Sequence, residues 1–253
     1  PAAARGVQPP PPGALEPETL KLPDGPASMA GMALSPELSE FTGQLGFRLQ
    51  LPLPTARAGF GPALSLSYKG GRGMGVMGAG WSLETPAIQR RLDEGLPHYD
   101  GRDELELVGS QALAGRLVAV GDGEYRLQGR GQEVRIQREG ENFLVTDQNG
   151  LQYRFGFDPS ARLGSRGRIH RWLLARVDDL SGQSIRYEYG KDQGQAYLES
   201  VQWGPEDRFH CQLSYEARPD PVLSFATGQR VQTAQRLQQL EVRVGTVLRH
   251  RWN

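Results

Sequence analysis

Apolar and polar residues alternate along most of this chain. Apolar side chains occupy every second position in residues 47–53 and again in residues 64–68. A period of two places successive side chains on opposite faces of a strand, so each run predicts a β-strand. Further alternating runs cover residues 104–108, 125–127, 133–136, 143–146, 152–157, 184–189, 198–203, 209–215 and 240–252.

Short glycine-containing pairs separate these runs and predict the turns between them. Asn149-Gly150 is a strong hairpin signal, because both residues tolerate positive φ. The other turn pairs are Asp122-Gly123, Glu139-Gly140, Ser181-Gly182 and Gly204-Pro205. Only residues 233–240 indicate a short helix. Roughly ten or more short strands with tight turns predict an all-β protein of antiparallel hairpins.

Glycine and proline are abundant, with 33 Gly and 18 Pro among 253 residues. Four consecutive prolines, Pro9 to Pro12, lie in residues 1–19, where large apolar side chains are scarce. We therefore expect a disordered, proline-rich leader there. In residues 20–253 glycine separates strands, which indicates a folded β domain. The abrupt first residue and the strand-like end predict that this sheet continues in a longer protein.

The charges balance, with 29 Lys plus Arg and 29 Asp plus Glu. A neutral chain lacks the basic excess that non-specific nucleic-acid binding requires. No run approaches the about 20 apolar residues of a membrane-spanning helix. One cysteine and four scattered histidines do not make a multi-thiolate or histidine-rich metal site. We expect no cofactor, no metal, no nucleic-acid partner and no membrane span.

The segment GMGVMG, residues 73–78, fits the G-x-G-x-x-G pattern of dinucleotide-binding proteins. That pattern requires a following helix whose N-terminus binds the pyrophosphate. Here Gly80 and Pro86 come next, so the helix cannot form. We predict instead a tight loop in which backbone passes close to backbone, with Trp81 as a large core residue beside it.

An acidic cluster is the main candidate for catalysis. Paired carboxylates can act as acid and base in glycoside hydrolysis, or bind calcium. Arg90, Arg91 and Arg102 lie among them, which favours ion pairs at solvent-exposed turns instead. The acidic residues are Asp93, Glu94, Asp100, Asp103, Glu104 and Glu106.

Cys211 shares a face of its predicted strand with Phe209 and Leu213, while His210 points the other way. We interpret this cysteine as a buried small hydrophobe and not as a nucleophile. Aromatic residues along the strands, such as Tyr153 and Tyr187, leave two alternatives open. They pack a sheet face, or they form a surface that binds a sugar or a peptide.

Three consecutive stretches carry a family resemblance. The first covers residues 20–54, the second is GFGPALSLSYKGGRGMGVMGAGWSL at 59–83, and the third is PAIQRRLDEGLPHYDGRDELELVG at 86–109. They resemble the N-terminal SpvB-type domain of Salmonella virulence plasmid B-like proteins, of insecticidal toxin-complex B components and of related Rhs or YD-repeat toxin shell proteins. The motif residues that carry the resemblance are Gly59, Gly61, Pro62, Gly78, Gly80, Trp81, Pro97, Tyr99 and Asp100.

The resemblance implies a scaffold role without catalytic residues. In that family the region begins a hollow shell, a spiralling β-sheet that encloses a toxic C-terminal polypeptide. Implied partners are the remainder of the same shell with its YD repeats, the enclosed toxin, and a pore-forming A component or a secretion apparatus. The protein would be made in the bacterial cytoplasm and then secreted or injected. Its neutral, hydrophilic sheet would be wet on both faces, with Gly78, Gly80 and Trp81 at shell corners.

Other functions remain open at this point. The chain could be a free-standing β module that binds a carbohydrate or a receptor, or the targeting domain of a SpvB-like ADP-ribosylating toxin. A third hypothesis is an enzyme built on the acidic cluster. The family's self-cleaving protease site and its ADP-ribosyltransferase pattern have no counterpart in this sequence, so neither contributes a residue here.

Overall fold

The computed structural model describes residues 34–38, 45–71, 73–110, 113–129 and 133–253. The predicted leader, residues 1–19, lies outside the described residues. The predicted all-β class is confirmed, because strands dominate the chain and helical geometry is confined, in the described part, to three short 3₁₀ turns. These turns are η1 (Arg57–Gly59), η2 (Pro159–Ala161) and η3 (Pro205–Asp207).

A small antiparallel sheet contains the first strands, in the order β1-β2-β3-β6. Its strands are β1 (Leu34–Leu38), β2 (Leu45–Gln50), β3 (Ser65–Lys69) and β6 (Trp81–Glu84). The predicted glycine-rich loop lies between β3 and β6 and forms a minimal hairpin of β4 (Met74–Gly75) and β5 (Gly78–Ala79). No helix comes after this loop, as the sequence predicted.

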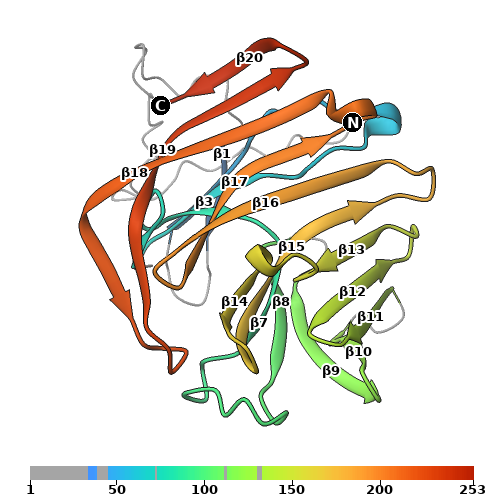
Figure 1. Cartoon of the computed structure of the whole chain (residues 1–253), viewed down its shortest axis with the longest axis vertical. Coiled ribbons are helices and arrows are strands. Elements are labelled where there is room, and N and C mark those ends of the chain that lie inside the picture. The colour runs from blue at the N-terminus through green and yellow to red at the C-terminus, as the bar shows by residue number, and fades with distance from the viewer. Residues whose placement is uncertain (1–33, 39–44, 72, 111–112, 130–132) are drawn as a thin grey trace, which may run out of the picture. The chain divides into compact units, whose positions relative to one another are not determined.

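Eight strands of the larger sheet form a closed barrel (Figure 1). Strands β7 to β13 each pair with the next, and β15 pairs with both β13 and β7, which closes the ring. The strands are β7 (Ala87–Arg90), β8 (Leu105–Val108), β9 (Gly115–Gly121), β10 (Glu124–Leu127), β11 (Val134–Glu139), β12 (Asn142–Asp147), β13 (Gln152–Phe155) and β15 (Arg168–Asp178), with β14 (Arg162–Ser165) paired beside β15.

The barrel interior is dry and aromatic. Trp172 is 2% exposed, its ring lies 5.0 Å from that of Phe143, and its indole N–H donates to the carbonyl of Glu141 at 2.6 Å. The alternation that predicted the strands supplies this interior, because every second side chain points inward. The expectation of a sheet wet on both faces is therefore wrong for these strands. Other buried barrel residues are Leu107, Leu127, Ile136, Val145 and Phe155.

Five further strands extend from β15 as an antiparallel ribbon, visible in orange and red in Figure 1. They are β16 (Ser184–Asp192), β17 (Gln195–Trp203), β18 (Phe209–Ser224), β19 (Val231–Val244) and β20 (Val247–Trp252). We call these strands the ribbon. They complete a sheet of 14 strands.

The sheet branches along β15. Leu173 lies opposite Ala87 of β7, whereas Arg176, three residues later, lies opposite Arg186 of β16. Between the two pairings the hydroxyl of Tyr189 donates to the carbonyl of Leu174 at 2.8 Å. Tyr189 is 7% exposed, so a buried side chain satisfies the backbone where β7 and β16 diverge.

Two expectations about the C-terminal part were wrong. Residues 233–240, predicted as a short helix, lie within β19, because pairing with β18 along its length outweighs the helix propensity of Ala, Gln and Leu. Residues 240–252, read as one alternating strand, form the end of β19 and all of β20. The turn between them contains Gly245 at φ +58°.

Candidate functional site

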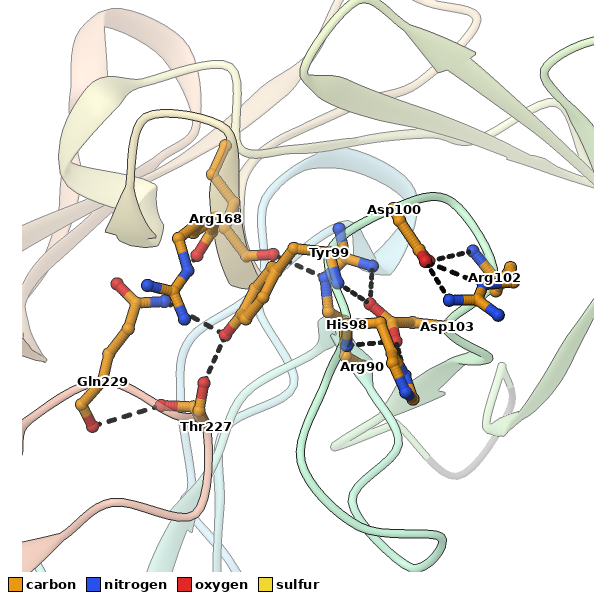
Figure 2. A network of polar contacts seen from close by, with 10 residues as sticks. Arg90, His98, Tyr99, Asp100, Arg102, Asp103, Arg168, Thr227 and Gln229 are labelled. Carbon is orange, nitrogen blue, oxygen red and sulfur yellow. Dashed lines mark hydrogen bonds and ion pairs between the residues drawn. The ribbon is translucent and has the colours of Figure 1, made fainter.

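The loop between β7 and β8 contains the third family motif, and its residues meet around one buried carboxylate (Figure 2). The side chain of Asp103 is 5% exposed. It accepts hydrogen bonds from the backbone amides of His98 and Tyr99, both at 2.8 Å. Its Oδ2 also lies 2.7 Å from Nη1 of Arg90. Asp103 therefore fixes the loop by binding donors from β7 and from the middle of the loop.

Two carboxylates of this loop, Asp103 and Asp100, are held in the ionised form. Burial opposes ionisation of Asp103, but hydrogen bonds from the His98 and Tyr99 amides and the Arg90 charge outweigh it and lower its pKa. Hydrogen bonds from the side chain and backbone of Arg102 lower the pKa of Asp100 to about 2. A general acid in glycoside hydrolysis needs the opposite shift.

Three more carboxylates of the cluster, Asp93, Glu104 and Glu106, make similar contacts. Arg91 pairs with both Asp93 and Glu104, and Arg116 lies 3.2 Å from Glu104. Glu106 accepts a hydrogen bond from the amide of Gln89 at 2.7 Å. The arginines interspersed in the sequence predicted such ion pairs. The geometry thus supports a structural role for the acidic cluster and does not support the enzyme hypothesis.

Tyr99 connects this loop to distant parts of the chain. It adopts φ +61°, an uncommon conformation for a residue other than glycine. The guanidinium carbons of Arg90 and Arg168 lie 4.9 and 5.0 Å from the centre of its ring. Its hydroxyl donates to the carbonyl of Thr227 at 2.6 Å and accepts from the amide of Gln229 at 3.0 Å.

Gln229 extends the same connections to the β14–β15 hairpin. Its Nε2 donates to the carbonyl of Arg168 at 2.6 Å, and its Oε1 accepts from the amide of Ser165 at 3.0 Å. Arg90 donates through Nε to the carbonyl of Ile169 at 2.8 Å. We call Arg90, Tyr99, Asp103, Arg168 and Gln229 the Tyr99 network. It joins three hairpins: β7–β8, β14–β15 and β18–β19 (Figure 2).

The other residues of the third motif support the loop from its surface. Pro97 is half-buried beside the network. Asp100 is exposed and accepts from the backbone amide of Arg102 at 3.1 Å and from its Nε at 2.7 Å. Sequence reasoning identified this loop but missed Arg168, Thr227 and Gln229, because no local pattern marks a contact between residues so far apart in the chain.

The loop between β2 and β3 contains three motif residues of the second stretch, Gly59, Gly61 and Pro62. Ala58 and Gly59 both have positive φ, at +57° and +78°. Gly59, Gly61 and Pro62 line a cavity of about 600 Å³, together with Tyr187. The indole N–H of Trp203 donates to the carbonyl of Pro54 in the same loop at 3.0 Å, which ties the loop to the ribbon.

The glycine-rich loop binds the ribbon through its backbone. The carbonyl of Gly75 accepts from Nη1 of Arg218 at 3.1 Å, and that of Val76 accepts from the amide of Leu237 at 2.7 Å. A Cβ on Gly75 would lie 2.1 Å from the carbonyl oxygen of Trp81, so the predicted close approach of two backbone segments is confirmed.

Gly78 and Gly80 also adopt positive φ, and a Cβ on Gly80 would lie 2.5 Å from the Tyr68 ring. Trp81 differs from the expectation of a core residue, because it is only half-buried. Its ring packs 5.3 Å from that of Tyr68 on the neighbouring strand β3, and part of its surface stays in contact with solvent. The three groups of motif residues thus support separate loops and do not converge on one site.

Cys211 is fully buried, as the strand pattern predicted, and burial raises the pKa of its thiol to about 12. Such a thiol is protonated and unreactive at neutral pH. Within the described ranges, no three His, Cys, Asp or Glu side chains are placed to hold a metal ion. In that same part of the chain, no helix has the length and apolar character needed to cross a membrane.

Sequence comparison matches residues 39–145 to the family described as Salmonella virulence plasmid 65kDa B protein, SpvB. The mono(ADP-ribosyl)transferase SpvB of Salmonella typhimurium (strain 14028s / SGSC 2262) is 31% identical over 176 residues, which are 58% of this chain and 30% of that protein. Its counterpart from Salmonella choleraesuis (strain SC-B67) is 30% identical over the same length. The chain thus spans 30% of the length of these curated relatives.

Solved structures share the fold at lower identity. The N-terminal domain of effector protein SpvB from Salmonella typhimurium strain LT2 matches with a TM-score of 0.62 at 24% identity, over 76% of this chain and 86% of that one. The TcdB2-TccC3 crystal structure matches with a TM-score of 0.75 at 19% identity, over 94% of this chain and 16% of that one. The Photorhabdus luminescens Tc holotoxin pore gives 0.73 at 20% identity, over 90% and 14%. Residues 39–145 therefore match the SpvB family, and the predicted resemblance to the SpvB-type N-terminal domain is confirmed.

Proposed function

We propose that this chain is a non-enzymatic structural segment of a bacterial toxin, whose β-sheet forms part of a shell around a toxic C-terminal polypeptide. One observation carries the proposal: β15 belongs to a closed barrel and also pairs with β16, the first strand of the open antiparallel ribbon. A closed barrel has no free edges and is stable by itself, so it can anchor a sheet that grows strand by strand.

The comparisons with solved structures favour a segment of a shell over the other candidate functions. The likeness to TcdB2-TccC3 extends over 94% of the chain, against 76% for the SpvB N-terminal domain. The additional length favours an architecture in which the barrel and ribbon occur together. The ionised carboxylates paired with arginine and the buried thiol serve the fold, which leaves the enclosed polypeptide to supply the toxic activity.

The ribbon also indicates how the implied partners would attach. Among the described strands, β20 pairs with β19 alone, and its Val247 and Leu248 are exposed. An unpaired strand edge is a template for another strand. The remainder of the shell would add there, and a pore-forming A component or a secretion apparatus would receive the assembled particle after its release from the bacterium.

Limited proteolysis of the complete protein that contains this chain tests encapsulation. We expect its C-terminal polypeptide to survive protease in native buffer and to be digested once denaturant opens the shell. The same polypeptide produced alone is the control and should be digested at once. A C-terminal polypeptide cleaved equally fast in both samples, or a natural protein that ends at residue 253, would contradict the proposal.

A second candidate is the targeting domain of an ADP-ribosylating effector. The observation that favours it is the activity in the name of the curated relatives, mono(ADP-ribosyl)transferase. The two functions require different polypeptides on the C-terminal side of this domain. A compact transferase joined by a protease-sensitive linker would support the effector, whereas a hollow particle seen by electron microscopy would support the shell.

A further inference from the structure

A pocket of about 290 Å³ lies where three segments of the larger sheet meet. The β14–β15 hairpin contributes Arg162 and His170, the β16–β17 hairpin contributes Lys191, and the segment entering β19 contributes Gln229 and Arg230. Three of these side chains are cationic. No aspartate or glutamate occurs among the described residues that line the pocket.

The cations are only partly neutralised. Arg162 pairs with Glu141 at 2.9 Å. Lys191 donates to the carbonyl of Pro159 at 2.5 Å, and Arg230 donates to the amide oxygen of Gln232 at 2.7 Å. The last two contacts are with neutral oxygens, so they leave positive charge in the pocket.

Lys191 has a lowered pKa in this pocket. Burial is the main cause, the Arg162 charge adds to it, and Asp158 opposes the shift without cancelling it. A bound anion would favour the charged ammonium and oppose this shift.

His170 adds a polar group to the lining of the pocket. The residue is 8% exposed. Its Nδ1 is buried and makes no hydrogen bond within the described part of the chain. Burial, with Arg171 and Arg90 nearby, lowers its pKa to about 4, so the imidazole is neutral at pH 7. A neutral imidazole whose Nδ1 carries the proton can donate to an anion, and a buried unsatisfied nitrogen requires such an explanation.

We propose that this pocket binds the phosphate group of a phosphate-bearing ligand. Cations that converge from three segments suit a tetrahedral anion with several acceptor oxygens better than a planar carboxylate. The volume lies at the lower end of the roughly 300–1,000 Å³ of ligand pockets, which fits a phosphate or diphosphate group with the rest of the ligand outside.

The position of the pocket gives binding a structural consequence. Gln229 lines it and is also part of the Tyr99 network, where it donates to Tyr99 and Arg168 (Figure 2). A phosphate held by Arg162, Lys191 and Arg230 would connect the barrel to two hairpins of the ribbon. Ligand binding would therefore stabilise the same junction as the Tyr99 network.

Isothermal titration calorimetry with inorganic phosphate and with pyrophosphate, at constant ionic strength, tests the proposal on the 253-residue chain. We expect saturable binding, tighter for pyrophosphate. Lys191→Gln and Arg230→Gln should each weaken binding about tenfold, because each removes a charge-assisted hydrogen bond. Arg249→Gln is the matched control: it removes an exposed arginine on β20, outside the pocket, and should leave affinity unchanged.

Two further measurements complete the test. The imidazole NMR signal of His170 should shift on phosphate addition in the wild type and in Arg249→Gln. Vesicles with and without phosphatidic acid, compared with soluble ADP, distinguish a lipid headgroup from a soluble nucleotide as the source of the phosphate. Absence of saturable binding, equal weakening by Arg249→Gln, or an unshifted His170 signal would overturn the proposal.

Discussion

The barrel and the outer strands of the ribbon, β18 to β20, use the same antiparallel pairing but bury very different parts of their strands, whereas β16 and β17 contribute core side chains such as Tyr187 and Trp203. In the barrel, alternate residues from Leu107 to Trp172 fill a closed interior. When a sheet closes into a barrel, every strand has one face in the interior. In an extended sheet, a strand buries a face only where another element covers that face. In the ribbon, β18 and β19 accordingly bury side chains near β17, and farther along them only Arg218 is buried. The buried residues near β17 are Cys211, Leu213, Leu240 and Val242.

The exposed part of the ribbon carries an ion pair across its strands. Glu216 on β18 lies 2.6 Å from Arg236 on β19. An ion pair at such an exposed position stabilises a fold weakly. We therefore expect the barrel to set the stability of the domain and the outer ribbon to open first. Substitutions in the two regions and in the network between them test that difference.

Trp172→Ala should cost about 3–5 kcal/mol of unfolding free energy, because it empties the centre of the barrel and removes the hydrogen bond to Glu141. Urea unfolding measures the change. Trp252→Ala, at a half-buried position on β20, is the matched control and should cost about 1 kcal/mol. Equal losses at the two sites would contradict the division into a stable barrel and a weaker ribbon.

Asp103→Asn should cost about 3 kcal/mol at pH 7, since it leaves the buried Arg90 without its carboxylate. The pKa of Asp103 is lowered in the folded protein, so its contribution is complete above the ordinary value of 3.8 and is lost as pH falls below it. The difference between wild type and variant should therefore shrink below pH 4 in urea titrations.

Asp100→Asn is the control for this pH dependence. The Asp100 carboxylate is exposed and contacts Arg102 of the same loop, so its removal should change unfolding at pH 7 little. A loss at Asp100 as large as that at Asp103, or a wild-type advantage that persists at pH 2, would show that the Asp103 carboxylate does not act through its charge.

The strands were predictable because the pattern that defines them is local. The Asn149-Gly150 turn and the run at 143–146 lie where the alternation places them, in the β12–β13 hairpin. Closure into a barrel was not predictable, because it depends on β15 pairing with two strands distant in sequence. For the same reason residues 233–240, polar and rich in helix-forming residues, gave no sign of their pairing with β18.

The loop around Asp103 was partly predictable. Its alternating arginines and carboxylates indicated ion pairs, and the motif around Tyr99 drew attention to the loop. The pattern did not reveal that Asp103 is buried, nor that Gln229 binds the Tyr99 hydroxyl. Burial and long-range hydrogen bonds arise from the tertiary arrangement, and a single sequence carries no periodic signal for either.

Tyr99→Phe removes a hydroxyl that joins the β7–β8 loop to the β18–β19 turn. The carbonyl of Thr227 and the amide of Gln229 lose a partner, and we expect a cost of about 1 kcal/mol in urea unfolding. Tyr125→Phe is the control: this half-buried tyrosine packs on Phe143, and within the described residues its hydroxyl makes no hydrogen bond.

Amide hydrogen exchange shows which region of the protein loses stability in the Tyr99→Phe variant. If the network joins two regions of unequal stability, amides of residues 225–230 should exchange faster in the variant, while those of 143–145 in the barrel keep their wild-type rates. The weaker partner loses protection first, because the barrel strands keep all their own contacts when the hydroxyl is removed. Faster exchange in the barrel with unchanged exchange in the turn would mean that the ribbon stabilises the barrel. The barrel would then be the less stable of the two regions.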